Sequence, residues 1–201
     1  FGGVVLNSAD TIVISAFLGL TLLAVYQNYY FVMSSICGIM EILLTSITAG
    51  LGNSYITESK EKNYTDLKKI TFMFFWLTGM CTSCFLGIFQ PFMRLWVGEK
   101  FLMGFSVVVC LCVYFYLYET TRLLNVFKNA GGIWHEDRFR PLISAIVNLA
   151  LNLISVNYIG IYGIVLSTIV ALGVIEIPSL LQNIFTVMYD TSLFKDYFKM
   201  F

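Results

Sequence analysis

Six apolar runs occupy most of the 201-residue chain, and they approach or exceed the length of a membrane-spanning helix. A helix needs about 20 mostly apolar residues to cross the hydrocarbon core of a bilayer. Only 12% of the residues are charged, compared with about 25% in ordinary soluble domains. We therefore predict an all-α membrane protein whose spans lie at residues 4–20, 23–51, 70–93, 104–126, 142–157 and 161–186.

The stretch from Asn129 to Thr168 shows how two neighbouring runs are organised. A charged loop at 134–140 stops at Pro141, whose fixed φ and missing N–H suit the first turn of a helix. The following run carries polar side chains spaced four, four and three residues apart, which places them on one helix face. These residues are Ser144, Asn148, Asn152 and Ser155. The fifth helix is therefore expected to carry a polar stripe along a rod of membrane length.

Two hydrophilic segments lie outside the six runs. The second run is expected to end at the glycines of 50–53, because glycine favours helix termination. Residues 57–69 are then expected to form a solvated loop or a surface helix. The last segment, 187–201, mixes lysines with Phe194, Tyr197 and Phe198, a pattern typical of an amphipathic helix at the membrane surface.

The positions of Lys and Arg predict the orientation. Alternating the six spans gives nine of these residues to one side and two, Arg94 and Lys100, to the other. Cytoplasmic loops carry the excess of positive charge, so both ends of the chain are expected in the cytoplasm. The nine residues are Lys60, Lys62, Lys68, Lys69, Lys128, Arg138, Arg140, Lys195 and Lys199. Because the chain starts at Phe1 and enters a span almost at once, we expect a fragment of a longer protein.

Five ionisable residues fall within or near the expected hydrocarbon: Asp10, Glu41, Glu119, Arg122 and Glu176. Each costs about 2.5 to 3.5 kcal/mol at the centre of a helix. Glu119 and Arg122 are one turn apart, so they can form an ion pair, or Arg122 can face a water-filled cavity and attract an anionic head group. The other three have no partner in their own helices and are expected to point inward, either for ion coupling and cavity polarity or as hydrogen-bonded packing.

The sequence offers little that favours an enzyme. It contains no Ser/His/Asp arrangement, phosphate-binding loop or HExxH motif, and its one histidine, His135, lies in a loop. The five cysteines lie inside apolar runs, where packing explains them better than a metal or redox site. A formal charge of zero gives no support for nucleic-acid binding. Several tyrosines could stack on sugars, but interfacial or packing roles are the simpler explanation for Tyr26, Tyr29, Tyr30, Tyr114, Tyr116 and Tyr118.

Several short stretches, in order along nearly the whole chain, carry a resemblance to a known family. They are Ser8-Ala9-Asp10, residues 14–20, Tyr26-Gln27-Asn28-Tyr29, Gly52-Asn53, Pro91-Phe92, residues 95–98, residues 130–142, Asn148-Leu149, residues 160–163, Thr168-Ile169 and Glu176-Ile177-Pro178. Together they resemble the Wzx-type polysaccharide flippases of the multidrug/oligosaccharidyl-lipid/polysaccharide superfamily.

The resemblance implies a fold with two six-helix lobes, of which this chain is the C-terminal one, in a protein of roughly twelve to fourteen helices built like the multidrug antiporters. Residues 187–201 would then lead into a missing C-terminal part. The implied function is to flip undecaprenyl-pyrophosphate-linked oligosaccharide across the bacterial cytoplasmic membrane by alternating access. The resemblance implies no cofactor and no metal site, coupling to H⁺ or Na⁺, and contact with other membrane proteins of glycan assembly.

Residue roles follow from the same resemblance. The expected substrate-binding residues are Arg122, Glu119, Asn28, Tyr29 and Asn148, and the expected ion-coupling or cavity residues are Asp10, Glu41 and Glu176. Two alternatives remain open. A cation-coupled multidrug antiporter of the same superfamily would have a strongly acidic cavity without arginine. A membrane glycan polymerase or ligase would carry a large charged external loop with paired catalytic groups.

Overall fold

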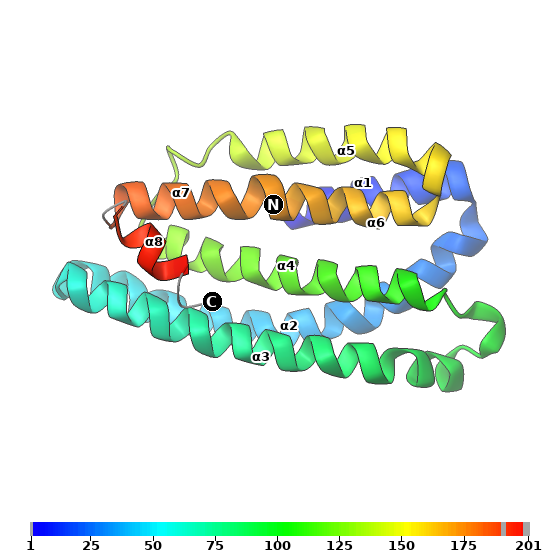
Figure 1. Cartoon of the computed structure of the whole chain (residues 1–201), viewed down its shortest axis with the longest axis horizontal. Helices are drawn as coiled ribbons and strands as arrows, with labels where there is room; N and C mark the ends of the chain where they lie inside the picture. Colours follow the sequence, from blue (N-terminus) through cyan, green and yellow to red (C-terminus); the bar gives the residue numbers. More distant parts are fainter. Residues whose placement is uncertain (1, 190–191, 199–201) are drawn as a thin grey trace.

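The computed structural model describes residues 2–189 and 192–198, and every regular element in this part of the chain is helical (Figure 1). Within the described residues, five helices are long and apolar enough to cross a membrane: Leu20–Thr57 (α2), Lys60–Trp96 (α3), Phe105–Ala130 (α4), Arg140–Ile159 (α5) and the continuous rod Ile161–Val187. The first predicted span corresponds to α1 (Gly2–Val13) and the π-helical turn η1 (Ile14–Leu18). Its described apolar part, Ser8–Leu18, is shorter than a spanning helix.

The hydrophilic segment at 57–69 belongs to two helix ends. The glycines of 50–53 do not end α2, which continues to Thr57, so the expected stop there was wrong. Ser59 caps the next helix, because its side chain accepts a hydrogen bond from the Lys62 N–H. The polar residues on either side of this cap therefore extend α2 and α3 beyond their apolar parts.

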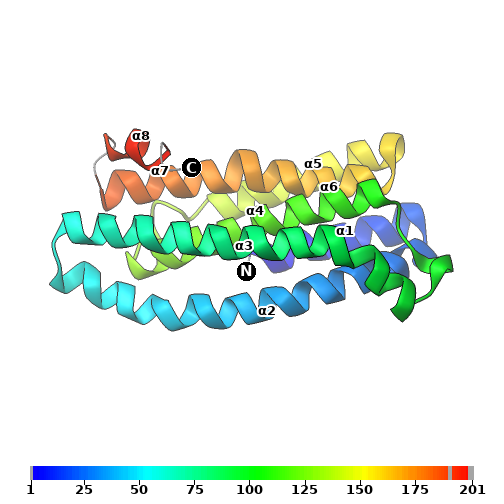
Figure 2. The same ribbon diagram turned by 60° about the horizontal axis from the view of Figure 1, so that its bottom comes forward.

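The long helices run side by side along the long axis of the molecule, and α4 is central (Figures 1 and 2). It packs against α2, α3, α6 (Ile161–Val170) and α7 (Ile177–Val187), whereas α1 packs mainly against α5. The turns 58–59 and 131–139 and the end of α7 gather at one end of the bundle, on the left in Figure 1. The turns at Gly19, 97–104 and Gly160 gather at the other end, so the connections alternate as predicted, with the Lys- and Arg-rich ones together.

The hairpin of the fifth and sixth runs forms as the sequence predicts. Pro141 lies in the first turn of α5, and Gly160, at φ 58°, turns the chain into α6 (Ile161–Val170). A side chain with φ in this region is strained, so glycine suits the turn. The absence of a side chain at Gly163 lets the two helices approach closely. A Cβ built on this residue would lie 2.7 Å from the backbone of Ser155.

The sixth run is one rod in three parts, because a π-helical segment, η3 (Ala171–Glu176), separates α6 from α7 (Ile177–Val187). Pro178 follows in the first turn of α7. Proline has no N–H to donate inside a helix, and a π-turn locally rearranges the backbone bonds. This irregular segment positions Glu176 in the interior, where the residue is 4% exposed.

The described part of the C-terminal segment packs against protein. In α8 (Leu193–Phe198), Tyr197 is buried and its hydroxyl donates a hydrogen bond to Thr71 of α3. The Tyr64 hydroxyl donates to the Leu193 carbonyl oxygen at 3.1 Å. Phe194 and Tyr197, both in ring contact with Phe185, therefore dock α8 onto the end of the bundle. The side chain of Phe198 and residues 190, 191 and 199–201 lie outside the described part.

Candidate functional site

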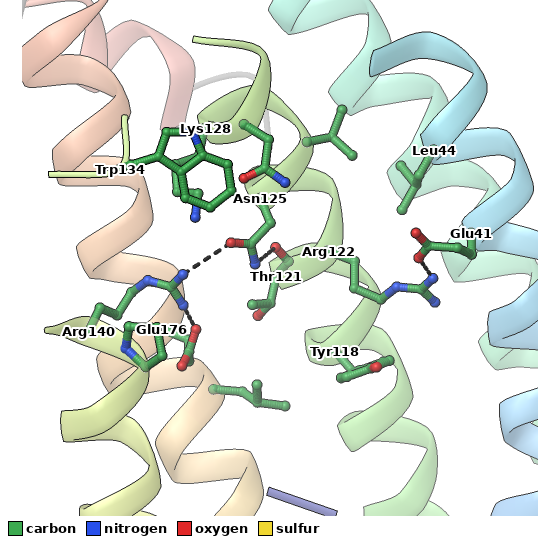
Figure 3. A pocket seen from close by; sticks show the side chains of 14 residues that line it. Glu41, Leu44, Tyr118, Thr121, Arg122, Asn125, Lys128, Trp134, Arg140 and Glu176 are labelled. Carbon is green, nitrogen blue, oxygen red and sulfur yellow. Dashed lines mark hydrogen bonds and ion pairs between the residues drawn. The ribbon is translucent and has the colours of Figure 1, made fainter. Parts of the chain in front are cut away.

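A polar cavity of about 440 Å³ lies beside α4 near the Lys- and Arg-rich end of the bundle (Figure 3). Its lining comes from α2, α4, η3, the start of α5 and Trp134 of the 131–139 loop. We call it the charged cavity, because Glu41, Arg122, Lys128, Arg140 and Glu176 line it. Residues from distant parts of the chain meet here because α4 is the helix on which the others pack.

Arg122 lies between two carboxylates. Its Nη1 donates to Glu119 Oε1 at 2.8 Å, the ion pair that the one-turn spacing predicts. It also forms an ion pair with Glu41 of α2, and Nη1 donates to the Cys37 carbonyl oxygen at 2.8 Å. The predicted ion pair is therefore confirmed, and Arg122 also lines a cavity. Attraction of an anionic head group stays a prediction.

The two carboxylates differ in exposure. The Glu119 side chain is fully buried, whereas that of Glu41 is 52% exposed. Glu41 therefore lies at the open side of the charged cavity, where it lines the cavity and remains half exposed. Only the Glu41 side of this ion pair is open, because the Arg122 side chain is 16% exposed. Glu41 is thus the partner that an incoming anion can most easily displace from Arg122.

Arg140 is the centre of a second network on the other side of the cavity. Its Nε and Nη2 donate to the two oxygens of Asp137 at 2.6 and 2.7 Å, in a bidentate pair. Nη2 also donates to Asn125 Oδ1 at 3.0 Å, and the guanidinium forms an ion pair with Glu176. Figure 3 shows Arg140 beside Glu176 and Arg122 reaching toward Glu41, with α4 between them.

Asp137 joins Arg140 to Lys128, whose Nζ donates to Asp137 Oδ2 at 3.2 Å. Burial acts to raise the pKa of the Asp137 carboxyl, but the hydrogen bonds and charges of Arg140 and Lys128 outweigh it and hold the pKa below its ordinary value. Lys128 also lies over the ring of Trp134, 4.3 Å from its centroid. The loop that carries Asp137 is therefore tied to α4 and α5 by charge.

A separate polar cluster lies between α1, α5 and α6. Asp10 accepts hydrogen bonds from Asn152 at 2.7 Å and from Thr168 at 2.9 Å. Asn148 donates to Thr168 at 2.9 Å and accepts from Asn152 at 3.2 Å. The polar stripe of α5 is therefore buried against α1 and α6, and Asn148 serves this cluster, away from the charged cavity.

The cluster holds one carboxylate among amide and hydroxyl groups, with little positive charge nearby. Asp10 is 4% exposed, and no Lys or Arg within the described residues forms an ion pair with it. In the same part of the chain the buried Asn152 Oδ1 has no hydrogen-bond partner. A carboxylate without a cationic partner is costly in an apolar bundle even when it is hydrogen-bonded, so binding of a proton by Asp10 would lower this cost.

Two expected substrate residues lie elsewhere. Tyr29 is fully buried near the opposite end of the bundle, where its hydroxyl donates to Gln90 at 3.0 Å and accepts from the Met103 N–H at 3.1 Å. Asn28 is half-buried and does not line the charged cavity. The geometry therefore gives Tyr29 a packing role and leaves the substrate role of Asn28 without support.

Sequence reasoning missed Lys128, Asn125, Asp137 and Arg140 as site residues. The charges at 134–140 suggested a solvated loop, yet Asp137 and Arg140 are only 3% and 8% exposed. The spacing of Asp137 and Arg140 could have indicated their ion pair, because residues three positions apart at the start of a helix can come into contact. Their partners on α4 and η3 are visible only in the packed bundle.

Comparison with protein-family models, curated proteins and solved structures gives no match for this chain. The described residues also contain no group of three or more His, Cys, Asp or Glu side chains that could hold a metal ion. The structure and its site therefore define the class of protein by themselves: an all-helical chain with membrane-length apolar helices and a charged interior cavity.

Proposed function

We propose that this chain belongs to a bacterial membrane transporter that flips undecaprenyl-pyrophosphate-linked oligosaccharide across the cytoplasmic membrane for surface polysaccharide synthesis. The observation that carries the proposal is the charged cavity, in which Arg122, Lys128 and Arg140 line one space within a membrane-length bundle. Arginine suits phosphate because its planar fork can make two parallel hydrogen bonds. The pyrophosphate would bind at these cations while the lipid tail stays in the bilayer.

In this proposal the carboxylates pair with the cations when the site is empty. Arg122 leaves Glu41 for the pyrophosphate, and on release of the lipid the ion pair forms again. A second lobe would face the exposed side of α2, and rocking of the two lobes would open the cavity to each leaflet in turn.

The Asp10 cluster would couple the movement to H⁺ or Na⁺. Its oxygens come from α1, α5 and α6, so an ion bound there changes the packing of these helices against one another. Coupling requires that the ion stabilises one arrangement of the helices more than the other. Asp10 is the charged member of the cluster and is therefore assigned the coupling role.

A cation-coupled multidrug antiporter is the second candidate, and the Asp10 cluster would serve it equally well. The charged cavity argues against this alternative, because Arg122 and Arg140 lie where an organic cation would have to bind. A glycan polymerase or ligase has less support, since the short turns at Gly19, 97–104 and Gly160 leave no room for a large catalytic loop.

The test is genetic complementation with a chemical readout. In a strain that lacks the gene, lipid-linked repeat units should accumulate on the inner leaflet, and the wild-type gene should clear them. Arg122→Lys should also clear them, because it keeps the charge. Normal glycan together with altered resistance to cationic drugs would replace the flippase by the antiporter.

Arg122→Ala alone is a poor probe, because it leaves the buried Glu119 without its partner. Removing one member of a buried ion pair costs about 3 to 5 kcal/mol. The double variant Glu119→Gln/Arg122→Gln removes both charges and is therefore expected to fold. If this folded double variant still clears the lipid-linked units, Arg122 has no role in binding the head group.

A further inference from the structure

A second cavity, of about 250 Å³, continues from the charged cavity toward the middle of the bundle. The two share Glu41, Tyr118 and Arg122 as lining residues. We call the second one the tyrosine cavity, since the aromatic residues of its lining are all tyrosines. Its lining residues are Tyr30, Met33, Ser34, Cys37, Gly38 and Glu41 of α2, and Tyr114, Tyr118 and Arg122 of α4.

Three of the tyrosines for which we predicted packing roles, Tyr30, Tyr114 and Tyr118, are brought together by α2 and α4. On α4, Tyr114 and Tyr118 are stacked with their ring centroids 5.6 Å apart. Arg122 covers Tyr118 from the next turn, with its Cζ 5.5 Å from the ring centroid. Tyr118 is therefore held between two neighbours, and Figure 3 shows it below Arg122.

Tyr30 on α2 is placed differently. One side of its ring is stacked on Tyr26, with centroids 6.2 Å apart. In the other direction along α2 the next residues on the same face are Ser34 and Gly38, which are too small to cover the ring. A Cβ built on Gly38 would meet nothing within 4 Å, so the cavity is open above this glycine.

The surroundings of this opening match the two kinds of surface on a pyranose ring. A sugar ring has an apolar face of C–H groups, which the negative face of an aromatic ring attracts. It also has a rim of hydroxyls, which carboxylates and guanidinium groups bind by charge-assisted hydrogen bonds. Tyr30 supplies the aromatic face here, and Glu41, half exposed beside Arg122, supplies an acceptor at the rim.

We propose that the tyrosine cavity is a sugar subsite that holds the first pyranose ring of the glycan while its phosphate lies in the charged cavity. This inference rests on the proposed function and assigns the part of the site that binds the sugar. From Arg122 to Tyr114 the cavity follows α4 for eight residues, about 12 Å at 1.5 Å per residue. That length accommodates a sugar attached next to a phosphate bound at Arg122.

The experiment compares two lipids that differ only in the sugar. Equilibrium dissociation constants are measured in lipid nanodiscs for undecaprenyl pyrophosphate carrying the repeat unit, extracted from the deletion strain, and for undecaprenyl pyrophosphate alone. Gly38→Leu fills the open space and Tyr30→Leu removes the aromatic face. Each should weaken binding of the glycosylated lipid about tenfold, equivalent to about 1.4 kcal/mol, and leave binding of the bare lipid within twofold of wild type.

Matched controls exist on both helices. Gly50 lies on α2, also has no atom within 4 Å of a built Cβ and lines neither cavity, so Gly50→Leu should leave both constants unchanged. Tyr116 of α4 lies beside Phe75 instead, and Tyr116→Leu should likewise have no effect. These variants separate filling the cavity from adding a leucine to a helix.

The possible failures are distinguishable. If the wild type binds both lipids equally, or if Gly38→Leu and Tyr30→Leu weaken both lipids alike, the sugar subsite is wrong and the flippase proposal survives. If the wild type binds neither lipid, both proposals fall.

Discussion

Replacing Arg140 by alanine should destabilise the bundle more than replacing the exposed Arg138 of the loop before it. Arg140 is 8% exposed and bonds to Asp137, Asn125 and Glu176. Without it, the buried Glu176 loses its ion-pair partner, and Asp137 keeps Lys128 and Asn183. The loss of one member of a buried pair costs about 3 to 5 kcal/mol, and we expect Arg140→Ala to fall in that range.

The measurement is the free energy of unfolding in detergent micelles, followed by circular dichroism as the denaturant concentration rises. Arg138→Ala is the matched control, because Arg138 is exposed and contacts only the exposed His135 among the described polar groups, at 3.0 Å. Exposed substitutions of this kind change stability by about 0.5 kcal/mol or less.

A double variant tests the stated cause. In Arg140→Leu/Glu176→Leu the unpaired carboxylate is gone, and apolar replacements for a buried pair are often neutral. This variant should recover at least half of the stability lost in Arg140→Ala. Equal stability of Arg140→Ala and Arg138→Ala, or a double variant no better than the single one, would refute the reasoning.

Three further predictions concern separate parts of the chain. Gly163→Ala should cost about 1 to 3 kcal/mol of unfolding free energy through overpacking against Ser155, whereas Gly79→Ala, in open space, should not be destabilising; equal effects would contradict the close approach of α5 and α6. The pKa of Asp137 is lowered from 3.8 in the folded state, so its contribution to stability is present above pH 3.8 and is lost as the pH falls through the folded pKa. Asp137→Asn should therefore lack this loss of stability in an acid titration, and an acid profile equal to that of the wild type would exclude Asp137 as its cause. Asp10→Asn keeps the shape of the cluster without the charge, so transport in vesicles should lose its response to an imposed H⁺ or Na⁺ gradient; an undiminished response would remove Asp10 from coupling.

Part of the candidate site follows from sequence alone. Glu119 and Arg122 are one helical turn apart, so their ion pair needs only local geometry. The face shared by Ser144, Asn148 and Asn152 is equally local, and all three are buried. The fate of the tyrosines could not be predicted in this way, because Tyr30 and Tyr118 meet only when α2 packs on α4.

The sequence by itself determined the class of protein. In an apolar run of membrane length, a helix satisfies the backbone N–H and C=O groups within the segment itself. Pro141 and Gly160 mark helix boundaries through their own backbone geometry, independently of the rest of the chain. Only the tertiary structure decided which charges meet. Arg140 pairs with Glu176 because α5 lies beside η3, and Glu41 reaches Arg122 because α2 lies beside α4. Such pairings depend on helix packing between residues far apart in the chain, which periodicity along one helix does not encode.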